Sequence, residues 1–168
     1  LGVDLIQRVH GEPAKGIKGV WCLSLDSGEM ESISGDAVLI ATGGCGQLWE
    51  RTTNPPVASG DGLAMAVRAG AASKDMAFFQ FHPTALMAGN ERPFLITEAL
   101  RGEGGVLLDE VGLESYRLSD SKPDDFSFTL DFSPDGSLAT RDVVARACDQ
   151  RMKISGADFV WLVTDHLD

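Results

Sequence analysis

Two features are missing from this sequence: a long apolar run and a surplus of basic residues. No stretch of 18 apolar residues occurs, so the sequence predicts no membrane span. The 14 lysines and arginines are scattered and are outnumbered by 25 acidic residues, for a net charge of −11. A nucleic-acid surface needs clustered positive charge. We therefore expect neither a membrane nor a nucleic acid as a partner.

Cysteine is also scarce, since Cys22, Cys45 and Cys148 are odd in number and widely spaced. This pattern matches no metal site and favours a reducing compartment, so we expect three small buried apolar residues. The length of 168 residues is enough for a domain with its own core. The chain begins at Leu1 inside an expected strand and ends at Asp168 soon after another. We interpret it as an internal piece of a longer protein.

The first 41 residues have the pattern of β structure. We expect strands around 3–9, 16–25 and 29–33, arranged as an antiparallel meander with turns between them. The next segment, 37–41, is a short continuous apolar run. Such a run is typical of a strand buried on both faces of a parallel sheet.

Two glycine-rich segments follow this run. The first is Ala-Thr-Gly-Gly at 41–44, at a position where glycine lets a ligand approach the backbone closely. The second is Gly-Asp-Gly at 60–62, which opens an alanine-rich segment that favours a helix ending near Gly70. Taken alone, each segment is a weak signal, because a Gly-Gly after a strand is usually only a turn and Asp61 could simply cap the helix.

The second half of the chain mixes helix and strand, which with the first half predicts an α/β (α+β) fold. Residues 78–81 could form a strand that ends at His82. Segment 113–137 is rich in Ser, Asp and Pro, and we expect a loop or insertion too polar to join the core. A helix is expected over 141–154, capped by Thr140, before a strand at 159–163.

The most informative stretch is 78–105, which contains Gln-Phe-His-Pro-Thr at 80–84 and Thr-Glu-Ala-Leu-Arg-Gly-Glu-Gly-Gly at 97–105. An anionic ligand in a closed site must meet fixed hydrogen-bond donors, because burying an unpaired charge costs a prohibitive free energy. An imidazole, a hydroxyl and a guanidinium are such donors. A lone histidine is more often structural, and a lone Glu–Arg pair is more often a surface ion pair.

The two strings together resemble the substrate-carboxylate region of the succinate dehydrogenase, fumarate reductase and L-aspartate oxidase flavoproteins. Leu-Ala-Thr-Arg-Asp-Val-Val at 138–144 resembles a further segment of this family, and the two glycine-rich segments resemble the second half of its FAD-binding Rossmann domain. The alanine at 85 and the Ala-Leu at 99–100 look most like the L-aspartate oxidases.

The resemblance implies FAD as cofactor and a partial FAD-binding domain over 1–80. It implies a substrate-site and capping region over 81–155, with the polar insertion at 113–137, and the start of a further strand over 156–168. Arg141 corresponds to the family's proton-transfer residue and is the catalytic candidate. Residues of the substrate carboxylate cluster correspond to His82, Thr97, Glu98 and Arg101. The cofactor-binding candidates are Ala41, Thr42, Gly43, Gly44 and Asp61.

The implied reaction is oxidation of L-aspartate to iminoaspartate, with hydride transfer from Cα to FAD, in the cytoplasmic or plastid synthesis of NAD. The nearest alternative is a succinate dehydrogenase or fumarate reductase flavoprotein subunit. A third is an inactive scaffold, which the departures from the family at Ala77 and Val163 favour. The family's Gly-x-Gly-x-x-Gly turn is absent, so we do not expect this chain alone to hold FAD tightly. An open sheet edge predicts self-association of the isolated chain.

Overall fold

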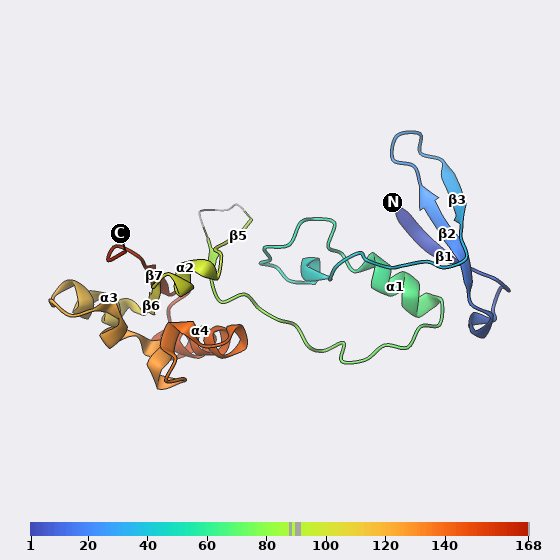
Figure 1. The fold of residues 1–168 in the computed structure, drawn as a ribbon. Helices are drawn as coiled ribbons and strands as arrows, with labels where there is room; N and C mark the ends of the chain where they lie inside the picture. Colours follow the sequence, from blue (N-terminus) through green and yellow to red (C-terminus); the bar gives the residue numbers. More distant parts are fainter. Residues whose placement is uncertain (88, 90–91, 168) are drawn as a thin grey trace. The chain divides into compact units, whose positions relative to one another are not determined.

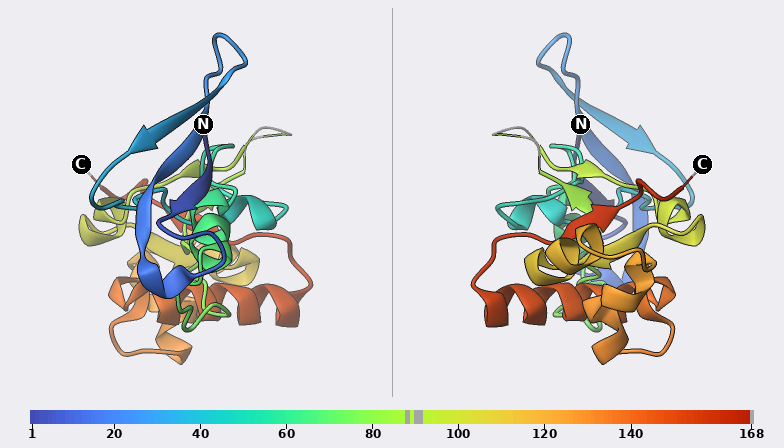
Figure 2. Two further views of the ribbon diagram at one scale, coloured as in Figure 1. Left: turned by 90° about the vertical axis from the view of Figure 1, so that its right-hand side faces the viewer. Right: turned by 90° about the vertical axis from the view of Figure 1, so that its left-hand side faces the viewer.

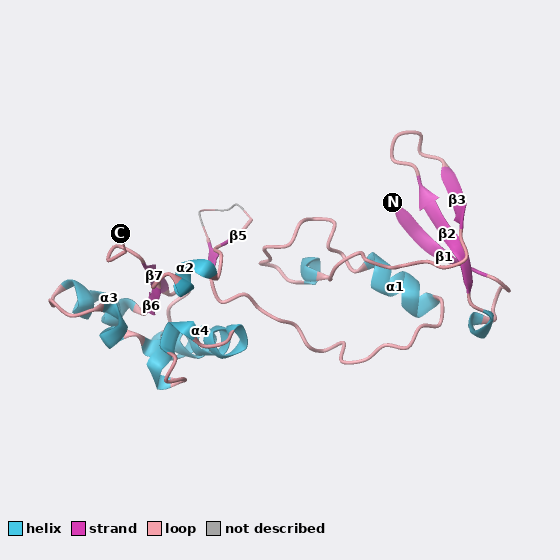
Figure 3. Cartoon of the chain, viewed as in Figure 1, coloured by secondary structure: helices cyan, strands magenta, loops and turns pink. Residues whose placement is uncertain are grey.

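The computed structural model describes residues 1–87, 89 and 92–167, and the chain forms two compact units, Leu1–Phe78 and Phe79–Asp168. Figure 1 shows the elements of each unit, and Figure 3 shows how helix, strand and loop alternate along the chain. Among the helices that the structure describes, none has both the length and the apolar character needed to cross a bilayer.

The first unit is built on an antiparallel meander of β1 (Gly2–Gln7), β2 (Ile17–Leu23) and β3 (Met30–Ser34), in that spatial order. This confirms the predicted meander, and Figure 2 shows the long turn that joins β2 to β3. Helix α1 (Asp61–Arg68) packs against β1, where Arg68 Nη2 donates to the carbonyl of Val3 over 3.0 Å. Short 3-10 turns lie at Pro13–Lys15 and Gly46–Leu48.

Two predicted strands of the first half do not form in this structure. Residues 37–41 have no regular secondary structure, and Leu39 is 92% exposed. Residues 78–81 are also irregular, with Phe78 largely exposed. A parallel strand exists only through the neighbours that accept and donate its backbone hydrogen bonds. Within 1–78, all of which is described, no strand lies beside 37–41, and the prediction was wrong for this reason.

The second unit is centred on the short strand β6 (Val106–Leu108), which pairs antiparallel with β7 (Trp161–Val163). Its side chains alternate between two clusters, as the period of a strand requires. Leu107 packs with Phe128 and with Val144 of helix α4 (Arg141–Ser155). The other face, Val106 and Leu108, packs with residues that include Leu113 of helix α3 (Glu110–Arg117). The remaining elements are β4 (Ala85–Leu86), β5 (Phe94–Leu95) and α2 (Ala99–Gly102).

Segment 113–137 differs most from its prediction as a loop outside the core. It contains most of α3 and three 3-10 turns, η3 (Pro123–Phe126), η4 (Phe128–Asp131) and η5 (Gly136–Leu138). Phe128 is only 3% exposed. The average composition of the segment therefore hides a buried subset, which includes the consecutive residues Ser127, Phe128 and Thr129.

Helix α4 is close to its prediction. It spans Arg141–Ser155 and ends at Gly156, which has a left-handed φ of 73°. Thr140 is at the N-cap position, as expected, but its hydroxyl donates to Asp142 Oδ1 over 2.7 Å and accepts no backbone N–H. The buried face of the helix includes Val144 and Ala147.

Candidate active site

The charged centre of the second unit is a chain of three side chains in which Glu98 joins two arginines. Glu98 Oε1 accepts from Arg101 Nη2 over 3.1 Å, and Glu98 Oε2 accepts from Arg141 Nε over 2.5 Å. Glu98 lies just before α2 and Arg141 is the first residue of α4. The fold therefore brings together two sequence motifs that are 43 residues apart.

The three side chains differ sharply in exposure. Arg101 is 2% exposed, whereas the side chains of Glu98 and Arg141 are 40% and 44% exposed. Arg101 Nη1 donates to the carbonyl of Ser137 over 2.5 Å, and its Nε has no hydrogen-bond partner among the described residues. A buried guanidinium is tolerated only when it is well paired. Arg101 thus lies beneath Glu98 as its anchor, and the exposed end of the cluster is formed by Glu98 and Arg141.

The electrostatics of the cluster keep Glu98 ionised. The hydrogen bond from Arg141 is the largest influence, and the charges of Arg141, Arg101 and His82 add to it. Together they outweigh the effect of desolvation and hold the pKa of Glu98 below its ordinary value.

His82 is held in place by Thr84. Its Nδ1 accepts from the Thr84 backbone N–H over 3.2 Å in one tautomer, in which Nε2 carries the proton and can donate to a ligand. Nδ1 is also 3.1 Å from the Thr84 carbonyl, to which the other tautomer donates. Thr84 is 5% exposed, and its hydroxyl donates to the carbonyl of Ile96 over 3.3 Å.

The contact between Thr84 and Ile96 continues the β4–β5 pairing to its end. Since the Ile96 N–H also donates to the Thr84 carbonyl over 3.1 Å, His82 and Thr97 emerge from the same end of this hairpin. The Thr97 hydroxyl accepts from the Ala99 N–H over 3.3 Å, as a helix-capping residue does. Its hydroxyl hydrogen can still be donated to a ligand.

All the substrate-site and catalytic candidates lie in the second unit, and its contacts join Glu98, Arg101 and Arg141 directly. The sequence prediction did not include Thr84 or Ser137, although each of them fixes one of these candidates. Thr84 could have been recognised from its position two residues after the histidine. Ser137 had no signal, because it lies in the segment that its composition predicted to be a loop.

The cofactor candidates lie in the first unit, where the two glycine-rich segments meet. A Cβ atom on Gly62 would collide with the Thr42 side chain, so glycine is needed for 41–44 to lie against the start of α1. Gly43 has a φ of 71°, and a Cβ on Gly43 or Gly44 would meet no atom within 4 Å. An open glycine backbone beside the N-terminus of a helix fits an anionic cofactor, with the carboxylate of exposed Asp61 able to accept from its hydroxyls.

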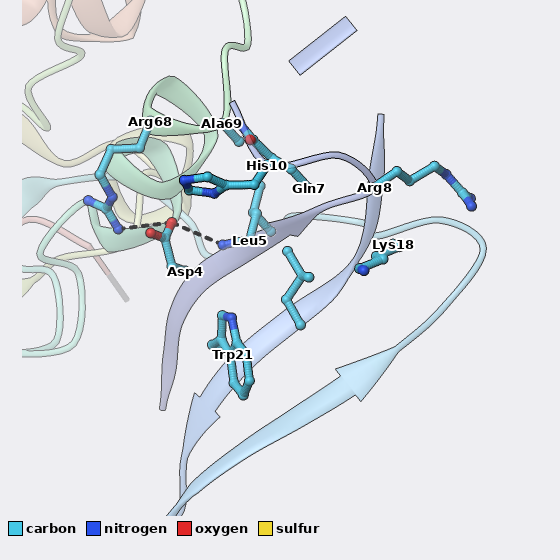
Figure 4. Close-up of a pocket in the computed structure, with 10 residues that line it drawn as sticks. Asp4, Leu5, Gln7, Arg8, His10, Lys18, Trp21, Arg68 and Ala69 are labelled. Atoms are coloured by element: carbon cyan, nitrogen blue, oxygen red, sulfur yellow. Dashed lines mark hydrogen bonds and ion pairs between the residues drawn. The ribbon is translucent and has the colours of Figure 1, made fainter. Parts of the chain in front are cut away.

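A hollow of about 370 Å³ lies elsewhere in the first unit, lined by β1, β2 and the end of α1 (Figure 4). Two of its basic side chains are engaged in contacts within the unit. Arg68 pairs with Asp4 over 3.4 Å, and Arg8 donates to the carbonyl of Asp36 over 3.1 Å. In the part of the chain that is described, no cluster of His, Cys, Asp and Glu is arranged to hold a metal ion.

Comparison with known proteins identifies relatives of this arrangement. The FAD binding domain family matches residues 3–168. The L-aspartate oxidase of Yersinia pestis is 42% identical over 166 residues, which are 98% of this chain and 29% of that protein. The L-aspartate oxidase of Synechocystis is 48% identical over 123 residues, 73% of this chain and 20% of that protein.

A solved structure of a mutated E. coli quinol fumarate reductase matches with a TM-score of 0.77 and 28% identity. The match covers 100% of this chain and 28% of that one. The chain therefore spans less than a third of the length of these relatives.

Proposed function

Because the chain belongs to the FAD binding domain family, we propose that it is part of a flavoenzyme that oxidises L-aspartate to iminoaspartate. Bound FAD would supply the hydride acceptor. Curated relatives named L-aspartate oxidase, at 42% and 48% identity, support this substrate. We assign cofactor binding to Leu1–Phe78, through its glycine-rich segments, and substrate binding to the unit that follows. Iminoaspartate would then enter the synthesis of NAD.

The observation that carries the proposal is the Arg101–Glu98–Arg141 chain. Arg141 uses Nε to hold Glu98, which leaves its two terminal nitrogens for a substrate carboxylate. The Nε2 of His82 and the hydroxyl of Thr97 are donors for the carboxylate groups as well. These fixed donors can hold a dicarboxylate with its Cα–H bond in one orientation, which is the main contribution of a protein to hydride transfer.

Glu98 has two roles in this proposal. Its ionised carboxylate fixes the guanidinium of Arg141, which can then bind a substrate carboxylate and hold the Cα–H bond, whose hydrogen leaves as hydride, in one orientation. An arginine stays protonated and serves as a hydrogen-bond donor; the proton given up when the imine forms comes from the substrate ammonium group and passes to solvent. The same carboxylate offers a partner to the ammonium group of L-aspartate. Succinate has no such group, so this contact would favour the amino acid.

Succinate oxidation, or fumarate reduction in reverse, is the second candidate. It is favoured by the fumarate reductase structure, whose similarity extends over 100% of this chain. The same residues would donate hydrogen bonds to the substrate carboxylates in both reactions, since both substrates are four-carbon dicarboxylates. Only the contact of Glu98 with an ammonium group separates the two.

The test is anaerobic bleaching of the flavin absorbance in a full-length protein that carries this chain. L-aspartate and succinate are titrated separately. Bleaching by L-aspartate alone supports the oxidase, and bleaching by succinate alone supports the second candidate. Bound flavin that neither substrate reduces would contradict both candidate reactions. The inactive scaffold would then be the interpretation that remains.

Arg141→Leu should abolish bleaching of the flavin. The substitution removes a hydrogen-bond donor for the substrate carboxylate and also removes the partner of Glu98. Arg146→Leu is the matched control on the same helix. Arg146 pairs with Asp142 over 2.7 Å, and its side chain is 68% exposed. We expect the control to retain the rate of flavin reduction of the unsubstituted protein. Equal rates of flavin reduction in the two variants would show that Arg141 has no role in the reaction.

A further inference from the structure

Three buried hydroxyl groups surround the backbone of Leu107 in the middle of β6. Ser127, Thr129 and Ser137 come from the turns η4 and η5 and the residue before η4, and each is at most 7% exposed. The Leu107 N–H donates to Ser137 Oγ over 3.0 Å, and Ser127 Oγ donates to the Leu107 carbonyl over 2.8 Å. These contacts satisfy the edge of β6 that β7 does not cover.

The hydroxyls also bond to one another and close a ring. Thr129 Oγ1 lies 2.7 Å from Ser127 Oγ and 3.3 Å from Ser137 Oγ. One direction satisfies every group, since Leu107 N–H donates to Ser137, Ser137 to Thr129, Thr129 to Ser127, and Ser127 to the Leu107 carbonyl. Each hydroxyl then donates once and accepts once. Such a closed network holds its members in one arrangement, and a missing member leaves buried groups unpaired.

The ring is connected to the charged cluster through Ser137. While its hydroxyl belongs to the ring, its carbonyl accepts from Arg101 Nη1 over 2.5 Å. Among the described residues, the guanidinium of Arg101 donates to two groups, the Ser137 carbonyl and the Glu98 carboxylate. Its Nε is buried without a partner. A shift of the Ser137 backbone would therefore remove one of the two contacts that seat the guanidinium.

We propose that Ser137 is a positioning residue for the reaction, because its hydroxyl, locked in the ring, fixes the carbonyl that seats Arg101 and thereby Glu98 and Arg141. In this role Ser137 acts through Arg101 and not by binding substrate. It also lies four residues before Arg141, so the same turn that accepts from Arg101 leads directly into α4. This inference rests on the proposed function, since the geometry that it protects is that of the carboxylate cluster.

The test compares Ser137→Ala with two matched variants in the full-length flavoprotein. We expect Ser137→Ala to lower kcat by about tenfold or more with little change in KM, because small displacements of catalytic groups cost rate. Ser137→Thr restores a hydroxyl and should recover at least half of the lost rate. Ser121→Ala, the same substitution at an exposed serine, should have the rate of the unsubstituted protein.

A second readout does not depend on activity. The carboxyl carbon of Glu98 is followed by NMR during a pH titration, with Glu98→Gln used to assign its signal. In Ser137→Ala the pKa of Glu98 should rise toward its ordinary value, because Arg101 and Arg141 are no longer held beside it. This result would stand even if neither L-aspartate nor succinate reduced the flavin of the unsubstituted protein.

Three outcomes would overturn the inference. One is an unchanged Glu98 titration in Ser137→Ala. Another is a kcat equal to that of the unsubstituted protein. The last is a loss of rate that Ser137→Thr does not recover and that matches the loss of bound flavin and of thermal stability. In the last case the ring would be only a structural element of the core.

Discussion

At the scale of single residues, Glu98 decides the properties of the site. It lies between a buried and an exposed arginine and accepts from both. Removing its charge would leave Arg101 buried with a single strong partner and would release Arg141. The buried charge of Arg101 and the more exposed charge of Arg141 would therefore both lose their contact with Glu98.

We predict that Glu98→Gln lowers kcat/KM for L-aspartate by roughly 100-fold, since Arg141 would no longer be oriented. Stopped-flow reduction of the flavin would measure the rate. Glu103→Gln, at an exposed glutamate one turn further on, is the control and should leave the rate unchanged. A Glu98→Gln variant as fast as this control would contradict the prediction.

The pH dependence has a defined sign. The pKa of Glu98 is lowered in the folded state, chiefly by the hydrogen bond from Arg141, so its carboxylate stays ionised below the ordinary value of 4.5. The stabilising effect is present above the unfolded-state pKa and is lost as the pH falls through the folded-state pKa. In a pH titration of stability, Glu98→Gln should differ most from the unsubstituted protein near neutral pH, and the difference should shrink in acid.

Cys148 illustrates the opposite effect of burial on an acid. Desolvation raises the pKa of its thiol to about 11, against a smaller opposing effect of Arg101. The thiolate is the reactive form, so alkylation at pH 8 should be about 100-fold slower in the folded protein than in urea. Mass spectrometry of the modified peptides would give both rates. Similar rates in the two states would contradict the burial of Cys148.

At the scale of elements, α4 packs on η4 and on the cluster that includes Leu107 of β6. Val144 is fully buried and packs in the cluster around Leu107. The same helix begins at Arg141, so the packing of its apolar face also positions the catalytic candidate. Arg151 strengthens the contact further along, where it pairs with Asp131 over 2.6 Å and lies over the Phe128 ring.

We predict that Val144→Ala lowers the free energy of unfolding by about 2 kcal/mol, through lost burial and the cavity left behind. Ile154→Ala on the same helix is the control, since Ile154 is 76% exposed and should cost less than about 0.5 kcal/mol. Urea unfolding followed by circular dichroism would compare the two. Equal midpoints for both variants would show that α4 does not pack as described.

At the scale of the whole molecule, the first unit leaves much of its apolar surface exposed. Its three-stranded sheet has two open edges, β1 and β3, and every residue of β3 is exposed. The relatives are more than three times as long, with this chain matching 29% of the Yersinia pestis protein. In a protein of that length, other segments are available to cover the sheet edges and the exposed apolar residues of this unit.

We therefore predict that the isolated 168-residue chain self-associates through this sheet. Its elution in size-exclusion chromatography should shift to larger sizes as the concentration rises. Ile33→Lys places a charge on the open edge strand, where Ile33 is 55% exposed, and should weaken the association. A sharp monomer peak at every concentration would contradict the prediction.

Local patterns were sufficient for part of this protein. The antiparallel meander and the extent of α4 follow from periodicity, turn residues and the glycine at 156 that ends the helix, all of which act over a few neighbouring residues. The short strings at 80–84 and 97–105 also identified the family, because a motif is a property of adjacent residues. The sequence by itself therefore determined the local elements and the family.

Only the tertiary structure decided which distant residues meet. It joined Glu98 to Arg141, buried Arg101 beneath them, and placed Ser137 of a polar segment in the core. It also left 37–41 without a strand, because no neighbour pairs with it in the first unit. Pairing, burial and hydrogen-bond rings depend on groups far apart in sequence, and no local pattern contains them.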